Sequence, residues 1–311
     1  MRIVFMGTPD FAVPSLEALV KEEHHIVGVF TQPDRPKGRG KKLTMPPVKE
    51  KALENHLEVF QPNSLKDIGV VEAIKEMCPD VIVVVAYGQI LTKEILQIPA
   101  LGCINVHASL LPKYRGAGPI QWAIIHGEKT TGITTMYMEE GLDTGDMILK
   151  EEVPIGEDET AGELHDRLAL IGGRLLKETL LQIERGNAPR EKQKEELSTY
   201  APMLTKELGE IQWHKTAGEI HNLIRGTIPW PMAYTTYLGK IMKIWKSSVE
   251  VSNASHQPGK IIEVKKDKIY VGTGKNLLVI EELQFSGGKR LAVKDFLVGN
   301  TIEKNILLGK E

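Results

Sequence analysis

The sequence is poor in cysteine and in long apolar runs, and these absences exclude several classes of protein. Its 311 residues include only Cys78 and Cys103, without the paired Cys/His spacing of a zinc site. Both stand beside apolar runs, so we expect buried, reduced thiols and no metal. No run approaches the roughly 18 apolar residues of a membrane span. The opening MRIVFMGTPD is typical of a first strand and a turn rather than a signal peptide, so we expect a cytoplasmic protein.

Motifs of three common enzyme classes are also missing. The turn after the first predicted strand reads GTPD instead of GxGxxG, which argues against a dinucleotide-dependent oxidoreductase. The chain has neither a P-loop nor the GxSxG elbow of serine hydrolases. Cys103 would lie deep in a strand. We therefore expect an external nucleophile to attack a bound donor directly, without a covalent enzyme intermediate.

Neither sign of charge dominates, since 39 Lys and Arg stand against 41 Asp and Glu, for a formal net charge of −2. The distribution is nevertheless uneven. Residues 206–311 hold 16 basic and 11 acidic side chains, whereas the first 205 residues hold 23 and 30. The C-terminal third either contacts an anion or carries an ordinary excess of solvated lysines, and charge alone does not separate these two interpretations.

The first half of the chain alternates short apolar runs with amphipathic ones. We predict strands at 2–7, 25–32, 57–62, 80–88 and 103–109, and helices at 14–22, 47–56, 70–77 and 119–127. After residue 130 the pattern changes to two strands, at 130–138 and 146–155, and one long helix at 160–186. Strands that are apolar on both faces and separated by helices indicate an α/β fold with a mainly parallel sheet and helices on each side. Such sheets bind ligands beyond the carboxyl ends of their strands.

A second domain is expected after the long helix at 160–186. The helix begins with a capping box at Thr160 and Glu163 and ends at Gly186. Residues 187–206 are polar and weakly periodic, as in a linker. A helix at 216–226 and several short strands with glycine turns follow, and the last predicted strand is KRLAVKDFL. This pattern predicts a small β-barrel.

The segment CINVHASLLPKYRG, residues 103–116, ends an apolar strand with polar side chains. Side chains alternate along a strand, so Asn105, His107 and Ser109 share one face while their apolar neighbours pack on the other. Asn105 and His107 are either hydrogen-bonded inside the core or functional. Because both lie near the carboxyl end of a strand, we favour function. An amide beside an imidazole can stabilise an oxyanion or move a proton.

A carboxylate partner for His107 is available in GLDTGD, residues 141–146. Two glycines make a flexible turn around Asp143, and Asp146 is the other candidate. Asp143 either orients the imidazole or is a turn residue bonded to its own backbone. The acids lie far from His107 along the chain, so spacing leaves the choice open.

The segment QPDRPKGRGKKL, residues 32–43, is rich in Pro and Gly and contains one acid. Its five basic side chains are Arg35, Lys37, Arg39, Lys41 and Lys42. A run of this kind is usually a solvated, mobile loop. At the carboxyl end of a strand it can equally contact a phosphate backbone, and its glycines let it order on binding. Lys113 and Arg115 add positive charge that we expect on the exposed side of their turn.

Six segments together resemble one enzyme family. They are MGTPDFAVPSLEAL, VFTQPDRPKGRGKKL, VVVAYGQIL, INVHASLLPKYRGAGPIQWAI, GLDTGDM and IPWPMAY. The chain resembles the methionyl-tRNA formyltransferases over essentially its whole length. Its N-terminal half alone also resembles the wider family of formyltransferases that use 10-formyltetrahydrofolate. The resemblance implies a Rossmann-like catalytic domain of the formyltransferase fold at 1–189, a linker at 190–206 and an OB-like, tRNA-binding β-barrel at 207–311.

The resemblance also implies roles for particular residues. It matches Asn105, His107 and Asp143 to the family's catalytic residues. It places the folate in contact with two segments, a turn at Ser109, Leu110, Leu111 and Pro112 and a pterin-pocket wall at Ala86, Tyr87, Gly88 and Ile90. Arg39, with Lys41 and Lys42 beside it, matches the family's contact with the acceptor end of the initiator tRNA.

The activity that the resemblance implies is formyl transfer from 10-formyltetrahydrofolate to the amino group of methionyl-initiator tRNA, by a monomer without a metal. The alternative is a folate-dependent formyltransferase that acts on a sugar-nucleotide or ribonucleotide amine. The basic segment and the predicted barrel favour the tRNA substrate. A tRNA-binding protein without catalysis is a third possibility, against which the presence of Asn105, His107 and Asp143 argues.

Overall fold

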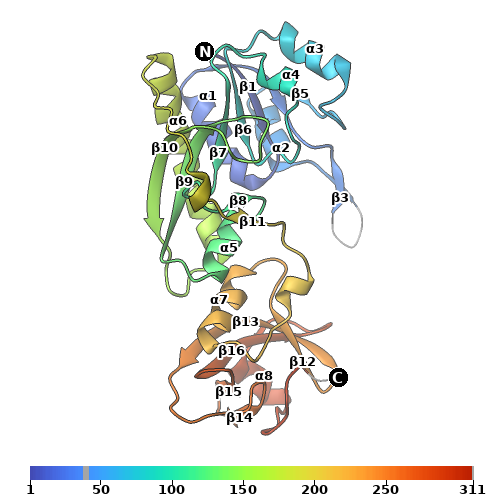
Figure 1. The fold of residues 1–311 in the computed structure, drawn as a ribbon. Helices are drawn as coiled ribbons and strands as arrows, with labels where there is room; N and C mark the ends of the chain where they lie inside the picture. Colours follow the sequence, from blue (N-terminus) through green and yellow to red (C-terminus); the bar gives the residue numbers. More distant parts are fainter. Residues whose placement is uncertain (38–41, 310–311) are drawn as a thin grey trace. The chain divides into compact units, whose positions relative to one another are not determined.

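The structure, a computed structural model, describes residues 1–37 and 42–309 (Figure 1). Contacts within the chain divide it into two compact units. The first unit comprises Met1–Pro119, Thr130–Pro154 and His165–Ala201. The second comprises Ile120–Lys129, Ile155–Leu164 and Pro202–Glu311. Two short stretches that precede residue 165 therefore belong to the second unit.

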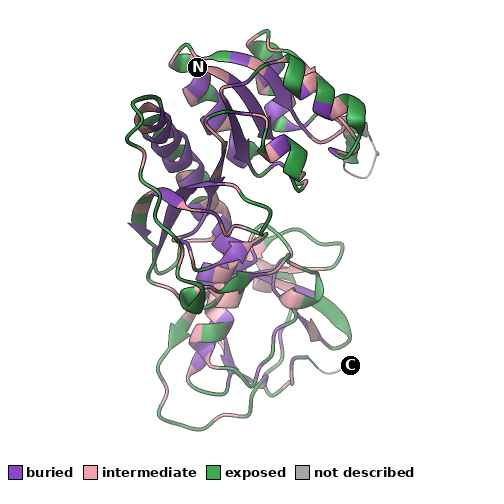
Figure 2. Ribbon diagram, turned by 45° about the horizontal axis from the view of Figure 1, so that its top comes forward, coloured by how far each residue is buried: buried purple, intermediate pink, exposed green. Residues whose placement is uncertain are grey.

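A seven-stranded sheet forms the centre of the first unit. Its strands, in spatial order, are β10 (Met147–Pro154), β9 (Thr130–Tyr137), β7 (Cys103–His107), β6 (Val81–Val85), β1 (Arg2–Gly7), β2 (His25–Phe30) and β5 (Val59–Phe60). The five strands from β7 to β5 run parallel, whereas β9 runs antiparallel to both of its neighbours. The prediction of a mainly parallel sheet is confirmed. Figure 2 shows that its central strands are buried.

Helices cover the sheet because its strands are apolar on both faces. They are α1 (Val13–Lys21), α2 (Pro47–Glu54), α3 (Ile68–Glu76), α4 (Lys93–Leu96) and α6 (Ala161–Glu184), with short 3-10 turns η1 (Asp10–Ala12) and η2 (Glu195–Leu197). Val4 and Met6 of β1 pack in one cluster with Ile74 of α3 and Ile95 of α4. On the other face α6 approaches β7 so closely that a Cβ at Gly172 would lie 3.1 Å from Val106.

Local signals placed most of these elements correctly. The capping box of α6 is present, since Glu163 N donates to Thr160 Oγ1 and Thr160 N donates to the Glu163 carboxylate. Gly186 follows the helix at φ +70°, a backbone conformation that glycine adopts freely. The four-residue helix α4 was not predicted, because a single turn carries too little periodicity to detect.

The ends of the basic segment form strands, so the prediction of a loop throughout is wrong. Strands β3 (Arg35–Lys37) and β4 (Lys42–Thr44) pair antiparallel. Before β3, the Asp34 carboxylate accepts hydrogen bonds from Lys49 Nζ at 2.9 Å and from Gln61 Nε2 at 2.8 Å. These bonds from Gln61 and Lys49 lower the pKa of Asp34, so the carboxylate stays charged at neutral pH. The hydrogen bonds of Asp34 thus fix the chain directly before β3.

The second unit is built on an antiparallel sheet. Its strands run in the order β12 (Tyr234–Tyr237), β13 (Lys240–Glu250), β16 (Leu277–Phe285), β15 (Ile269–Gly272) and β14 (Ile261–Val264), with β17 (Leu291–Ala292) beside β16. Register shifts near Lys246 mark bulges in β13, and bulges increase the bend of a strand. The helical elements are α5 (Pro119–Ile125), η3 (Glu207–Gly209), α7 (Ala217–Gly226) and α8 (Val293–Gly299). This curled antiparallel sheet confirms the predicted OB-like class.

Two predictions about local structure are wrong. The segment KRLAVKDFL forms a strand only at Leu291 and Ala292 and then becomes α8. Val293, Phe296 and Leu297 join the core at helical spacing. The helix is too short for this spacing to be recognised as a helical period in the sequence. Cys103 is buried as expected, but Cys78 is exposed, because it lies in the turn between α3 and β6 and not within an element of the core.

Thr134 of β9 holds the turn that follows β7. Its hydroxyl donates to the carbonyl of Ser109 at 2.7 Å and accepts from the amide of Leu111 at 3.1 Å. Thr134 is fully buried, so no water can replace these bonds. We expect Thr134→Val to lower the free energy of unfolding by about 1–3 kcal/mol. Urea denaturation measures this loss.

Two variants control for side-chain shape. Thr134→Ser keeps the hydroxyl and should retain most of the stability. Thr130→Val, at the exposed start of the same strand, should stay within about 0.5 kcal/mol of the parent protein. Equal stabilities for Thr134→Val and Thr130→Val would contradict the role of this hydroxyl.

The two thiols should differ in reactivity. Burial raises the pKa of Cys103 to about 12, whereas Cys78 is exposed. The folded protein should therefore titrate one thiol per chain with Ellman's reagent near neutral pH, and two after denaturation. Cys78→Ser should show none while folded. A folded parent protein that titrates two thiols would contradict the burial of Cys103.

Candidate active site

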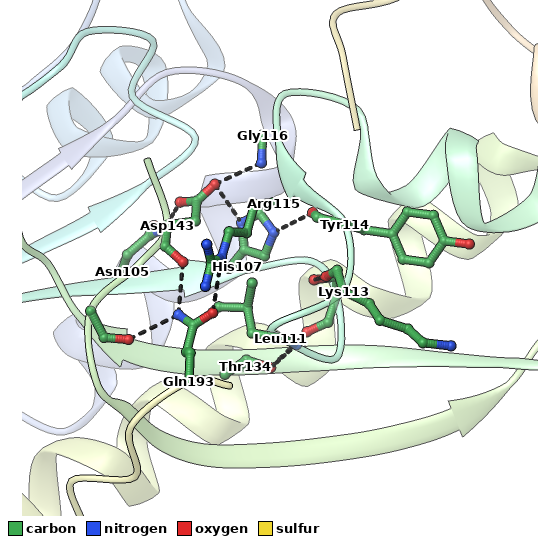
Figure 3. Close-up of polar contacts among 12 residues, drawn as sticks. Asn105, His107, Leu111, Lys113, Tyr114, Arg115, Gly116, Thr134, Asp143 and Gln193 are labelled. Carbon is green, nitrogen blue, oxygen red and sulfur yellow. Dashed lines mark hydrogen bonds and ion pairs between the residues drawn. The ribbon is translucent and has the colours of Figure 1, made fainter. Parts of the chain in front are cut away.

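Three polar side chains converge on one face of β7, toward its carboxyl end (Figure 3). The Asn105 amide nitrogen donates to Asp143 Oδ1 at 3.3 Å, and His107 Nδ1 lies 3.7 Å from Asp143 Oδ2. His107 is buried, while Asn105 and Asp143 are half-buried. The predicted alternation along β7 is confirmed for these two residues, since Val106 packs toward α6 on the opposite face.

Hydrogen bonding defines the chemistry of the His107 ring. His107 Nε2 lies 2.9 Å from the carbonyl oxygen of Tyr114. A carbonyl only accepts, so Nε2 carries a hydrogen and donates it. The other nitrogen, Nδ1, then carries a hydrogen only when the ring is protonated, and it faces Asp143. The ring nitrogen that can gain or lose a hydrogen is therefore the one that faces the carboxylate.

Asp143 occupies its place through an unusual backbone conformation. Its φ is +52°, which is uncommon for a residue with a side chain. Its Oδ2 accepts a hydrogen bond from the amide of Gly116 at 2.8 Å. Within the same turn, a Cβ at Gly145 would collide with the carbonyl oxygen of Tyr137, so this position requires glycine. Of the two candidate acids, the structure brings Asp143 to His107.

Asp146, the other candidate acid, faces a different group. Its carboxylate lies 3.8 Å from the guanidinium of Arg190, which stacks over the ring of Tyr137 at 3.7 Å from the ring centroid. The side chain is thus part of an ion pair beside the site.

The predicted folate segments border this cluster. Ser109 Oγ donates to the carbonyl of Lys113 at 2.6 Å and closes the turn, in which Leu111–Pro112 is a cis peptide. Ser109 and Leu111 are buried, and Leu110 and Pro112 are half-buried. The carboxyl ends of parallel β6 and β7 lie side by side, so the segment after β6 adjoins the same edge of the sheet.

In the segment after β6, exposed and buried positions alternate. Ala86, Gly88 and Ile90 are exposed, with 82% of Ile90 accessible, whereas Tyr87 is buried in the core cluster beside α3 and α4. Burial raises the pKa of Tyr87 to about 12, so the phenol is neutral. Its side chain thus supports this segment from behind, and its neighbours form the surface.

Sequence reasoning misplaced one residue of the site and missed another. Arg115, expected on the exposed side, is only 7% exposed, and its guanidinium donates hydrogen bonds to Gln193 and Glu195. Lys113 is exposed, as predicted. Gln193 lies in the segment predicted as a linker and contacts the Asp143 turn. A lone glutamine in a polar stretch carries no signal that would have identified it.

Of the three predicted tRNA-contact residues, the structure describes only Lys42. Arg39 and Lys41 lie outside the described residues, and Lys42 begins β4. Within residues 1–37 and 42–309, no group of three or more His, Cys, Asp or Glu side chains is arranged to hold a metal ion. None of the helices in this part of the chain combines the length and hydrophobicity that a membrane crossing requires.

Comparisons with known proteins agree with this architecture. The family model "Formyl transferase" matches residues 1–180, and "Formyl transferase, C-terminal domain" matches residues 203–301. The chain is 63% identical to the methionyl-tRNA formyltransferase of Alkaliphilus oremlandii, over 310 residues and 100% of both chains. It is 60% identical to the methionyl-tRNA formyltransferase of Clostridioides difficile, over 99% of this chain and 100% of that one.

A solved structure shares the fold at lower identity. It is WlaRD, a sugar 3N-formyl transferase crystallised in the presence of dTDP and 5-N-formyl-THF. The TM-score is 0.68 at 21% identity, over 94% of this chain and 98% of that one. The sequence identity to the enzymes of Alkaliphilus oremlandii and Clostridioides difficile extends over both units of the chain. The chain belongs to the formyl transferase family and, within it, to the methionyl-tRNA formyltransferases.

Proposed function

We propose that this enzyme transfers the formyl group of 10-formyltetrahydrofolate to the α-amino group of methionyl-initiator tRNA, giving formylmethionyl-tRNA for translation initiation. The observation that carries the proposal is the convergence of Asn105, His107 and Asp143 at the carboxyl end of β7. We also propose that the protein works in the cytoplasm as a monomer.

Asn105 and His107 are proposed to stabilise the charge that forms during transfer. Attack of the amine on the formyl carbon places negative charge on the formyl oxygen. The Asn105 amide and the Nδ1–H of a protonated His107 then donate to this oxygen. Removal of one preorganised donor of this kind typically slows a reaction by about 100- to 1000-fold.

Asp143 is proposed to hold His107 in place and to help take the proton that the attacking amine loses. The attacking amine becomes positively charged and must lose a proton, and Asp143 is the anionic group that faces both Asn105 and His107. The proton must finally reach N10 of tetrahydrofolate, which leaves as the formyl carbon–nitrogen bond breaks. These residues polarise the carbonyl by hydrogen bonds alone, so this route needs no metal.

The folate is proposed to lie between the turn Ser109–Pro112 and the surface made by Ala86, Gly88 and Ile90. These two segments follow neighbouring parallel strands. Ile90 is exposed over 82% of its surface, which fits an apolar wall that the flat pterin covers on binding. Tyr87 would support this wall from the core side.

The proposed assignment of domains is a catalytic part at 1–189, a linker at 190–206 and a tRNA-binding part at 207–311. The excess of basic over acidic residues in 206–311 supports the last assignment, because phosphate contacts dominate the affinity of nucleic-acid-binding proteins.

The activity can be tested directly with purified protein. We expect formyl transfer to methionyl-initiator tRNA and none to uncharged tRNA, to a sugar-nucleotide amine or to glycinamide ribonucleotide. In single-turnover experiments, Asn105→Ala and Asp143→Ala should each slow transfer by about 100-fold or more. Asp146→Ala, a neighbouring acid that faces Arg190, is the matched control and should retain most of the rate. Near-parent rates in both site variants would sink the assignment.

The contact with tRNA should depend on salt. Replacing Arg39, Lys41 and Lys42 with alanine should raise KM for the tRNA. Each lost phosphate contact should also reduce the slope of log(kcat/KM) against log[salt] by about 0.7–0.9. Lys21→Ala with Lys66→Ala removes two exposed positive charges, on helix α1 and before α3, and is the control for loss of charge elsewhere on the surface. An unchanged slope in the triple variant would assign the basic segment to solvent instead.

A further inference from the structure

The segment between Glu191 and Ala201 runs along the candidate active site rather than past it. At its start, Glu191 and Met147 exchange backbone hydrogen bonds of 3.0 and 2.8 Å. At its end, β11 (Tyr200–Ala201) pairs with β8 (Arg115–Gly116). The segment therefore contacts the loop that carries Asp143 and the loop that contacts His107.

Gln193 is the side chain of this segment that reaches the Asp143 turn (Figure 3). Its Nε2 donates to the carbonyl of Asp143 at 2.7 Å and to the carbonyl of Gly145 at 2.9 Å. Its Oε1 accepts from Arg115 Nε at 3.1 Å. Both amide hydrogens and the amide oxygen are thus engaged, so neither glutamate nor leucine could reproduce these contacts.

Arg115 links Gln193 back to the two catalytic candidates. Its neighbours along the chain are Tyr114, whose carbonyl accepts from His107 Nε2, and Gly116, whose amide donates to Asp143 Oδ2. The contacts therefore close a ring that runs from the Asp143 carboxylate through Gly116, Arg115 and Gln193 to the Asp143 carbonyl. The buried guanidinium is held in turn by two bonds of 3.1 and 2.9 Å to the Glu195 carboxylate.

This ring fixes Asp143 at both its main chain and its side chain. At φ +52° the residue occupies a backbone region that is unfavourable for most side chains, so surrounding contacts must hold it there. The Asp143 and Gly145 carbonyls, at either end of the turn, are the atoms to which Gln193 donates. Without these bonds the turn can relax, and the carboxylate can move away from His107.

We propose that Gln193, together with Arg115, is a positioning residue for formyl transfer, which keeps the Asp143 carboxylate directed at His107 and Asn105. This inference rests on the proposed function of these three residues. The segment that leads to the C-terminal unit thus completes the active site, instead of serving only as a tether.

The test is a double-mutant cycle on Gln193 and Asp143, measured as single-turnover formyl transfer at saturating donor. Gln193→Ala should slow transfer by about 10- to 100-fold, because misplacement of a catalytic group by about 1 Å can cost 100-fold. The double variant Gln193→Ala/Asp143→Ala should transfer at the rate of Asp143→Ala alone, within about twofold, because Gln193 acts through Asp143.

Two further variants separate positioning from general damage to the fold. Lys194→Ala, at the exposed neighbouring residue, should keep the parent rate. Gln193→Glu preserves side-chain size and can still accept from Arg115, but it places an acceptor against the two carbonyls. It should lose rate while retaining its KM for the donor, and it serves as the second variant if Gln193→Ala fails to fold.

The outcomes distinguish this inference from the proposed function. If Asp143→Ala retains its rate, the proposed roles of the site residues fail. If Asp143→Ala is slow but Gln193→Ala and Gln193→Glu stay within about twofold of the parent, the positioning role is refuted. Losses that multiply in the double variant would also refute it, because they would mean that Gln193 acts independently of Asp143.

Discussion

The hydrogen bond from the Gly116 amide to the Asp143 carboxylate, 2.8 Å long, is the contact on which the arrangement of the site depends. It joins the turn after β9 to the chain that follows β7. Through it the carboxylate faces the imidazole of His107 and the amide of Asn105. A free carboxylate would turn toward water, since ionised groups are strongly solvated. Here a backbone donor directs it toward the protein instead.

The sheet explains why this contact is available. Parallel β6 and β7 end at the same edge, and β9 returns antiparallel beside β7, so that Thr134 pairs with His107. The hairpin of β9 and β10 turns beside the start of β7, since Tyr137 pairs with Ile104, and the loop between the two strands brings Asp143 back over Asn105 and His107. One polar surface therefore receives groups from three stretches of chain. Arg115 gains its burial from the same geometry, because β11 covers the segment that follows the turn.

Sequence patterns predicted the elements with strong periodicity and the residues whose chemistry is unusual for their setting. The β-branched run of β6 and the capping box of α6 are local signals, and both were interpreted correctly. Asn105 and His107 became candidates because polar side chains rarely end an apolar strand without a reason. Val293–Gly299 was mistaken for a strand because seven residues span barely two helical turns. Gln193 was missed because its significance lies entirely in its partners.

The sequence by itself determined the layered α/β class, the antiparallel second unit and the identity of the polar groups, because hydrophobic period and side-chain chemistry are local properties. The choice of Asp143 over Asp146, the tautomer of neutral His107 and the burial of Arg115 were decided only by the tertiary structure. Each of these depends on a distance between atoms that lie far apart along the chain or on a backbone group presented at one angle. Such distances follow from how the sheet brings its loops together, and no short stretch of sequence encodes them.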